Sequence, residues 1–528
     1  MRYLPIHRAA GIPQRSRYGP YALHMILERT NMDPTDREEM ILQNPATGED
    51  ISKIVMANQN DVETAIFTAD EIFQSGVWSR APAIQRSGVL SNLARRLQDS
   101  LKQMARIESI QTGRAIREMD AQLGRLPEWF DYYAALLRTH QAFIAPTQGK
   151  LLNYVQRVPL GVVAQITPFN HPLLIAVKKI APALAAGNSV IVKPSELAPI
   201  SLLHFAEMAT AAGLPPGILT VLPGNGKTIG KAIASNPLVR KVDITAGTAT
   251  GRALGSLVGS NLAAFTAELG GKTPIVVFND ADPVAAANGA AFACFVASGQ
   301  TCVSGTRLIV QDEIYETFME LFMQKVHLIT SRMGDPLNYR TMMGSVISHR
   351  QLVRIEKLVQ RKGVGNILTG GRRMTGKSPM DDFDFSKGNF FPPTVITDVS
   401  TDDDLWREEI FGPVVVVKRF SDEREGVVLA NASKYGLGAG IWTNDVSRAH
   451  RVAADIQAGL VWVNTHHRND PSSPWGGMKE SGIGRENGVE AFEAYSQSKS
   501  TVLNIASPEE TRETQDWFAD NDAEKRYG

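Results

Sequence analysis

The chain has 528 residues, of which 43% are hydrophobic and 21% charged, an ordinary globular composition whose length predicts two to four domains. Basic and acidic residues number 55 each, so the net charge is zero and nothing indicates binding to nucleic acid or to an anionic membrane. The two cysteines exclude a disulfide framework and favour a reducing compartment, so we expect a cytoplasmic protein. No apolar run reaches the roughly 18 residues of a membrane-spanning helix.

The N-terminal extension, residues 1–40, has a composition of its own. Its first 27 residues contain four arginines, and no acidic residue precedes Glu28. Transit peptides of organelles are rich in arginine and poor in acidic residues, although this segment is short of serine. A disordered start has the same composition, so a mitochondrial location is the alternative to a cytoplasmic one.

Short β-branched runs alternate with alanine-rich stretches after the extension. The runs predict buried strands over residues 161–170, 188–196, 217–224, 239–247 and 273–278. Helices are predicted over residues 172–187 and 199–213, each ending in a glycine suited to a helix C-terminus. This alternation predicts a mostly parallel sheet covered by helices on both faces.

A second alternation follows and predicts a second α/β domain. Its strands are expected over residues 306–310, 392–399, 412–420, 438–443 and 459–464. The segment 371–391 is rich in Gly, Lys, Asp and Phe and is expected to be a surface loop. The polar segment 507–528 is expected to lie outside the core.

Two familiar motifs are excluded by their spacing. Residues 224–228, GNGKT, resemble the end of a phosphate-binding loop, but Val221 stands where that loop needs a glycine, so a turn is expected. His466 and His467 are adjacent, yet no further ligand type falls near them at a suitable spacing. We therefore predict no metal site.

Polar residues gather where predicted strands and tight turns end. Asn170 follows one strand, Lys193 and Glu196 follow the next, Glu268 lies on a glycine turn, and Cys302 lies in GQTC. A single cysteine is most often inert packing and a single glutamate a solvated surface group. An open parallel sheet binds its ligands at the carboxyl ends of its strands, so these residues together predict a site.

This combination resembles the aldehyde dehydrogenase superfamily from about residue 41 to about residue 502. The resemblance rests on TPFNHPLLIAVKKIAPALAAGNSVIVKPSE, ELGGKTP, SGQTC, EEIFGPV and PWGGMKESGIGREN. It implies a Rossmann-like NAD-binding domain, an α/β catalytic domain and a small β oligomerisation domain, with a homodimer or homotetramer as the assembly. The NAD-binding domain is expected over residues 41–144 and 160–278, and the catalytic domain over residues 279–490. The oligomerisation sheet is expected over residues 145–159 and 491–506.

The resemblance also implies a chemistry for five residues. Cys302 attacks the aldehyde, and the Asn170 amide and the Cys302 backbone N–H hold the resulting oxyanion. Glu268 activates the water that hydrolyses the thioester, with Lys179 and Glu486 as a proton relay behind it. Relatives that transfer the acyl group to coenzyme A commonly lack this glutamate, so hydrolysis is expected. For Lys179, a charge on a helix surface is the alternative.

The resemblance implies NAD as the cofactor, with NADP as a possibility. A carboxylate at Glu196 favours NAD because it repels a 2′-phosphate, whereas Lys193 offsets part of that repulsion. Many members have Gly-Ser where this chain has Ala246 and Gly247, so one hydroxyl contact to the pyrophosphate is missing. The full set implied for the cofactor is Ile166, Thr167, Pro168, Phe169, Lys193, Ser195, Glu196, Gly226, Ala246, Gly247, Leu269, Gly270, Glu409 and Phe411.

The substrate tunnel implied by the resemblance is more polar here than in members that act on aliphatic or aromatic aldehydes. Its lining is expected to be His171, Leu174, Lys178, Thr301, Val303, His466, His467, Arg468, Asn469 and Trp475. We predict a polar or carboxylate-bearing aldehyde, such as a semialdehyde, which Arg468 could bind bidentately. In the alternative, Lys178 and Arg468 face solvent and the substrate is aliphatic or aromatic. A coenzyme A-acylating enzyme and a catalytically silent binding protein are further alternatives.

Overall fold

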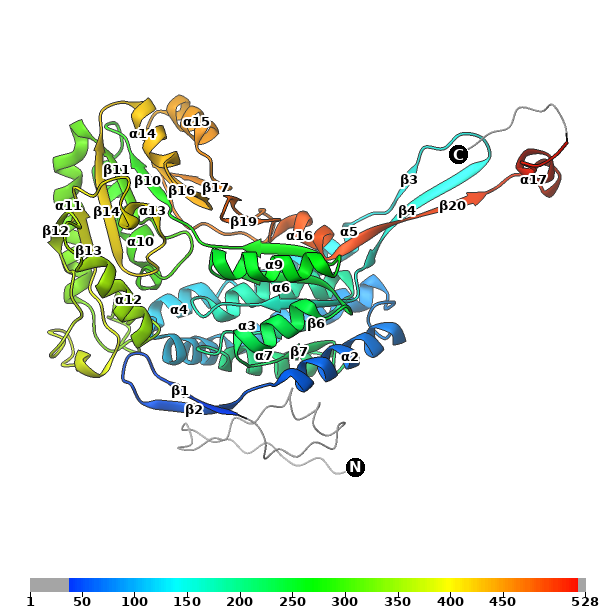
Figure 1. Cartoon of the computed structure of the whole chain (residues 1–528), viewed down its shortest axis with the longest axis horizontal. Coiled ribbons are helices and arrows are strands. Elements are labelled where there is room, and N and C mark those ends of the chain that lie inside the picture. Colours follow the sequence, from blue (N-terminus) through cyan, green and yellow to red (C-terminus); the bar gives the residue numbers. More distant parts are fainter. Residues whose placement is uncertain (1–37, 521–528) are drawn as a thin grey trace.

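Two large sheets organise residues 38–520, the part of the chain that this computed structural model describes (Figure 1). The first sheet has the strand order β19-β9-β8-β5-β6-β7. Its strands are β5 (Val162–Ile166), β6 (Ser189–Lys193), β7 (Leu219–Val221), β8 (Val239–Thr245), β9 (Ala264–Glu268) and β19 (Gly482–Ile483). Strands β5 to β9 pair in parallel, and β19 pairs antiparallel with β9.

Alternating apolar residues of the first sheet pack against helices on both faces. Val163 and Val192 face one cluster, and Ala164 and Ile191 face the other. The first cluster is built with α3 (Ala83–Thr112), α4 (Ile116–Leu123), α5 (Pro127–Thr139), α6 (Pro172–Ala186), α7 (Ile200–Ala211) and α16 (Gly488–Ala494). The second is built with α2 (Gln59–Ser75), η2 (Gly226–Gly230), α8 (Lys231–Ser235) and α9 (Thr248–Ser260).

The strand order of this sheet reverses between β5 and β8. From β5 the chain proceeds to β6 and β7 on one side, and it then returns to place β8 and β9 on the other. Ligands of open parallel sheets bind at such a switch point, beyond the carboxyl ends of the strands. The segments that follow β5 and β8 are therefore the expected place for a cofactor.

The second sheet has the order β12-β13-β14-β11-β10-β16-β17, and only β12 is antiparallel to its neighbour. Its strands are β10 (Pro274–Val277), β11 (Arg307–Gln311), β12 (Asn366–Thr369), β13 (Thr394–Thr397), β14 (Val414–Phe420), β16 (Gly438–Trp442) and β17 (Leu460–Val463). One face packs on α10 (Pro283–Phe295), η4 (Asp312–Ile314), α11 (Tyr315–Ser331) and η5 (Phe385–Lys387). The other packs on α12 (His349–Val359), α13 (Asp404–Arg407), α14 (Glu423–Asn431) and α15 (Val446–Asp455).

A narrow arm extends away from the two sheets (Figure 1). It consists of three antiparallel strands, β3 (Phe143–Ala145), β4 (Leu151–Pro159) and β20 (Ser496–Asn504), and leads to the exposed helix α17 (Pro508–Gln515). The remaining short elements are the hairpin β1 (Glu39–Gln43)–β2 (Asp50–Val55), the pair β15 (Tyr435–Gly436)–β18 (Met478–Lys479), and η3 (Val296–Gly299).

The predicted fold class is confirmed: two α/β units with parallel sheets and a small antiparallel sheet. The boundary expected at residue 278 is wrong, because β10 pairs with β11 and β16 and therefore belongs to the second sheet. Likewise, residues 482–483 return to the first sheet, and residue 143 already belongs to the arm. The arginine-rich start, up to residue 37, and residues 521–528 lie outside the described residues. Within residues 38–520, no helix combines the length and apolarity needed to cross a membrane.

Candidate active site

Cys302 follows a sharp backbone turn in η3. Ala297 and Ser298 have φ values of 55° and 53°, in the left-handed region that is unfavourable for residues with a side chain. The Ala297 backbone N–H donates to Glu118 Oε1 at 2.9 Å, and Ser298 Oγ donates to the Gly344 carbonyl at 3.0 Å. These bonds hold the turn, which sets the position of Cys302, a partly exposed residue.

Asn170 and Glu268 lie near Cys302 after strands β5 and β9. Asn170 Nδ2 donates to the Gln300 carbonyl at 2.8 Å, which ties the amide to the cysteine loop. A Cβ on Gly271 would lie 2.1 Å from the Cys302 carbonyl oxygen, so only glycine permits this approach of the two backbones. Asn170 Oδ1 and both Glu268 oxygens are buried without a hydrogen-bond partner among the described residues. Such atoms mark the place of a ligand or a reacting water.

Two lysines share the carboxylate of Glu486 behind the cysteine. Lys178 Nζ lies 2.5 Å from Glu486 Oε2, and Lys179 Nζ lies 2.5 Å from Oε1 while it also bonds Asp243. Both lysines are buried. A helix-surface position for Lys179 is therefore wrong, and Lys178 does not face solvent.

The charges of this cluster act on one another. Burial alone would raise the pKa of Glu486, but Lys178 and Lys179 outweigh it and lower the pKa to about 2. Burial, and then the Glu486 carboxylate, raise the pKa of Glu268 well above its usual range, while the two lysines oppose the rise. Burial and the carboxylates of Glu268 and Glu409 raise the pKa of the Cys302 thiol to about 12. A thiol with a pKa raised in this way needs a base to release its proton near neutral pH.

The carboxyl ends of β5, β6 and β8 lie where an open parallel sheet of this strand order binds a dinucleotide. Lys193 Nζ is buried, lies 3.2 Å from Glu196 Oε2, and would lie 3.7 Å from a Cβ on Gly226. Gly247 begins the 13-residue helix α9, and a Cβ there would meet no atom within 4 Å. The open N-terminus of α9 offers backbone N–H groups to a phosphate, which fits a pyrophosphate despite the missing serine hydroxyl.

The loop that precedes β14 of the second sheet contacts residues that follow β5 and β9 of the first sheet. Glu409 Oε1 accepts from the Gly271 backbone N–H at 2.9 Å, and the Phe411 ring lies 5.6 Å from that of Phe169 at 87°. Helix α12 positions their loop, since Arg354 donates to the Glu409 carbonyl and Gln351 to the Phe411 carbonyl. The remaining residues implied for the cofactor, Ile166, Thr167, Pro168, Ser195, Ala246, Leu269 and Gly270, occupy the same strand ends.

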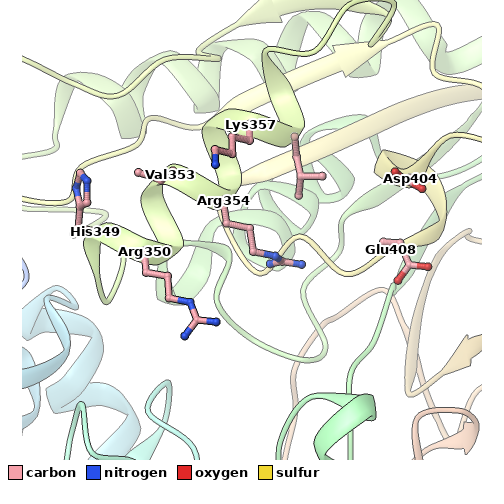
Figure 2. Close-up of a pocket in the computed structure, with 8 residues that line it drawn as sticks. His349, Arg350, Val353, Arg354, Lys357, Asp404 and Glu408 are labelled. Atoms are coloured by element: carbon pink, nitrogen blue, oxygen red, sulfur yellow. The ribbon is translucent and has the colours of Figure 1, made fainter.

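Basic side chains of α12 line a cavity of about 700 Å³ next to the Glu409 loop. Figure 2 shows these side chains on one helix, with two acidic residues at the start and just after the end of the short helix α13. The charged lining is His349, Arg350, Arg354, Lys357, Asp404 and Glu408. The sequence contained no motif that indicated this basic surface.

The residues expected to line the substrate tunnel fall into three groups. His171, His467, Trp475 and Lys178 contact one another in series, and we call these four residues the inner wall. All are buried except His467, which is partly exposed, and Leu174 and Thr301 are buried as well. Val303 and His466 belong to the core: Val303 has no exposed surface, and His466 Nε2 donates to its carbonyl at 2.9 Å. Both can shape the site only through the position of Cys302.

The third group lies on the outer side of Trp475. Arg468 is exposed, and its Nε donates to Thr465 Oγ1 at 3.3 Å. Together with Asn469 and Arg125 it lines a cavity of about 660 Å³ that also touches Trp475. We call this cavity the mouth of the site. Arg468 faces solvent there, as the alternative prediction has it, whereas Lys178 is buried.

Sequence reasoning missed two sets of contacts at the site. Arg114 and Gln122 contact His171 Nδ1, and Glu118 pairs with Arg114. The only local signal was the four-residue spacing of Arg114 and Glu118. Tyr495 Oη donates to Asp243 Oδ2 at 2.7 Å, behind Lys179. Nothing local in the sequence indicates that these residues meet.

Comparison with known proteins agrees with this geometry, since residues 32–501 match the aldehyde dehydrogenase family. The chain belongs to the aldehyde dehydrogenase family. It is thus a nicotinamide-dependent oxidoreductase that acts on aldehydes.

Solved structures of this family resemble the chain over nearly its whole length. A protein from Burkholderia cenocepacia is 40% identical, with a TM-score of 0.85 over 90% of this chain and 96% of the other. PnpE from Pseudomonas sp. WBC-3, solved with nicotinamide adenine dinucleotide, is 38% identical, with a TM-score of 0.85 over 89% and 95%. Betaine aldehyde dehydrogenase from Staphylococcus aureus, solved with NAD⁺, is 34% identical, with a TM-score of 0.86 over 90% and 93%.

Proposed function

We propose that this aldehyde dehydrogenase oxidises a polar aldehyde to a carboxylic acid with NAD, through a covalent Cys302 thioester that water hydrolyses. The observation that supports hydrolysis is the Glu268 carboxylate, which is buried near Cys302 with both oxygens unpartnered. A bound NAD would lie on the ends of β5, β6 and β8, and its nicotinamide would accept the hydride.

Acylation begins when the Cys302 thiol loses its proton to Glu268 and the sulfur attacks the aldehyde carbon. The carbonyl oxygen becomes an oxyanion, held by the Asn170 amide and the Cys302 backbone N–H. Asn170 uses one N–H for the Gln300 carbonyl, which leaves its second N–H for the substrate. Loss of hydride from the tetrahedral carbon then leaves an acyl thioester on Cys302.

Deacylation needs a base that removes a proton from the attacking water molecule. Glu268 takes a proton from a water molecule, the hydroxide adds to the thioester carbon, and the carbon–sulfur bond breaks to release the carboxylic acid. A base works best when its pKa lies near the working pH, and burial and the Glu486 carboxylate raise the pKa of Glu268 in that direction. Lys178, Lys179 and Glu486 form the route by which Glu268 returns its proton.

The preference for a polar substrate is supported by the inner wall and the mouth. An aldehyde with a carboxylate, such as a semialdehyde, would meet the Arg468 guanidinium at the mouth and the imidazoles of His171 and His467 in the inner wall. Glu196 beside Lys193 favours NAD over NADP. We further propose a cytoplasmic homodimer or homotetramer that pairs through the arm, whose edge strands are exposed.

The test is NADH formation by the purified full chain, without coenzyme A, on aliphatic, aromatic and semialdehyde-acid substrates. We expect turnover with NAD, a ranking led by a semialdehyde acid, and free acid as the product. A requirement for coenzyme A would favour the acylating alternative, and a clear preference for uncharged aldehydes would favour an apolar tunnel. No turnover with folded protein that binds NAD would favour the silent alternative.

Replacing Lys178 by methionine is expected to move the pH dependence of turnover. The Lys178 ammonium lowers the pKa of Glu268, so its loss raises that pKa further. Glu268 must be ionised to act as a base, so the rising limb of the kcat–pH profile is expected to shift to higher pH. The control is Lys102→Met at an exposed position. An unchanged limb, or a shift to lower pH, would contradict this assignment.

A further inference from the structure

Arg114 determines which nitrogen of the His171 ring carries the proton. His171 precedes α6 and is 3% exposed. Its Nδ1 lies 2.7 Å from Arg114 Nη1, 2.8 Å from Gln122 Nε2 and 3.1 Å from Gln122 Oε1, so Arg114 is the nearest of its partners. A guanidinium has only donors, so Nδ1 must be the acceptor. The ring proton therefore lies on Nε2.

Arg114 is held so that it keeps this orientation. Its guanidinium is buried, donates to the Asn170 carbonyl at 2.9 Å and pairs with Glu118. A second proton on His171 would face the N–H of Arg114. In agreement, burial and then the Arg114 charge lower the pKa of His171 well below its usual range, as do His467 and Lys178. His171 is thus a neutral ring with one N–H to offer.

That N–H has no partner within residues 38–520. His171 Nε2 is buried without a hydrogen-bond partner among the described residues. The ring contacts that of His467 at 6.0 Å, and His467 contacts Trp475 at 5.8 Å, so the donor belongs to the inner wall. A buried donor without a partner is costly, and an oxygen of a bound molecule would satisfy it.

The face of Trp475 is already occupied by a cation. Lys178 Nζ lies 4.4 Å from the centre of this ring and is anchored there by Glu486. Aromatic faces are the usual binding place of quaternary ammonium groups. Because Lys178 covers this face of the Trp475 ring, a cationic ligand cannot bind there, although Glu486 neutralises the charge of Lys178.

We infer that this wall selects aldehydes by their second functional group: His171 Nε2–H binds an acceptor oxygen of the substrate, and Lys178 on Trp475 excludes a quaternary ammonium. The inference rests on the proposed function and narrows its substrate class to aldehydes with a carboxylate, carbonyl or hydroxyl oxygen. Arg114 is a positioning residue, because it acts through His171.

The first experiment compares three four-carbon aldehydes on the wild-type protein: 4-oxobutanoate, butanal and 4-(trimethylammonio)butanal. We expect kcat/KM for 4-oxobutanoate to exceed that for butanal by about 10-fold or more, since a hydrogen bond to a charged group gives that discrimination. The ammonium compound is expected to be the poorest substrate. An ammonium compound that equals or exceeds butanal would overturn the inference.

Variants then assign the selectivity to the two residues. His171→Phe keeps a planar ring without the donor, and it is expected to lower kcat/KM for 4-oxobutanoate by about 10- to 100-fold, mainly through KM. His171→Gln should restore part of the loss, and the control His450→Phe, at an exposed position, should have no effect. Lys178→Met is expected to raise the ratio of ammonium compound to butanal by about 10-fold. These ratios cancel any change in Glu268, because every aldehyde uses the same base.

A binding measurement separates this inference from the proposed function. Absence of turnover on all aldehydes would reject the function, but calorimetry with butanedioate, a dicarboxylate of the same length, needs no turnover. We expect His171→Phe to weaken butanedioate binding about 10-fold or more relative to wild type and His450→Phe. Equal binding by all three proteins, or no binding by wild type, would overturn the inference.

Discussion

Replacing Cys302 by alanine is expected to lower NADH formation by about 10,000-fold or more, the scale on which other enzymes lose activity without their nucleophile. Without the sulfur, the tetrahedral adduct from which hydride leaves does not form, and neither does the thioester. Purified wild-type and variant proteins are compared under saturating aldehyde and NAD. The variant should still bind NAD, because the strand ends that would hold it are unchanged.

Cys294 provides the matched control for this experiment. It is buried in α10, and its thiol contacts the Gly305 carbonyl. Cys294 is 2% exposed, whereas Cys302 is partly exposed, so an aldehyde has no access to the Cys294 sulfur. Cys294→Ala is expected to keep turnover within about threefold, with a modest loss of stability. Comparable turnover by Cys302→Ala and wild type would remove Cys302 from the mechanism.

Replacing Glu268 by glutamine is expected to lower steady-state turnover by about 100- to 10,000-fold, the usual contribution of a general base. Glutamine keeps the shape of the side chain but does not accept a proton from water. Because hydrolysis would be more impaired than acylation, we expect a burst of about one NADH per active site, slower at neutral pH than in the wild type, followed by still slower turnover. Stopped-flow absorbance of NADH resolves the two phases.

The burst also separates the two tasks assigned to Glu268. If Glu268 only activates water, the burst rate is unchanged, and if it also takes the thiol proton, the burst slows at neutral pH and recovers at higher pH. The control is Glu490→Gln on the exposed side of α16. Steady-state turnover equal to wild type would contradict the role of Glu268 as the base.

Local patterns in the sequence predicted most of the fold. Runs such as residues 188–196 contain β-branched residues that are buried on both faces of a parallel strand, and β6 lies within that run. Helix α6 likewise ends one residue before Gly187, whose φ of 96° suits a helix C-terminus. Such signals depend on neighbouring residues alone and need no tertiary contact.

The partner of a strand was not predictable in the same way. Residues 273–278 read as a buried strand, but pairing with β11 and β16, rather than with β9, is decided by where the chain crosses between the sheets. Both sheets offer the same apolar surface to a Val- and Ile-rich strand. The expected domain boundary was therefore wrong although the strand itself was right.

The sequence by itself determined the α/β class and the motifs that bring Asn170, Glu268 and Cys302 into consideration, because residue type and short spacing carry that information. Only the tertiary structure decided the state of the charged residues. Lys179 and Glu486 are 307 positions apart, and Arg114 and His171 are 57 apart, yet each pair meets in the interior. A buried charge is stable only beside its partner, and partners this distant are brought together by folding alone.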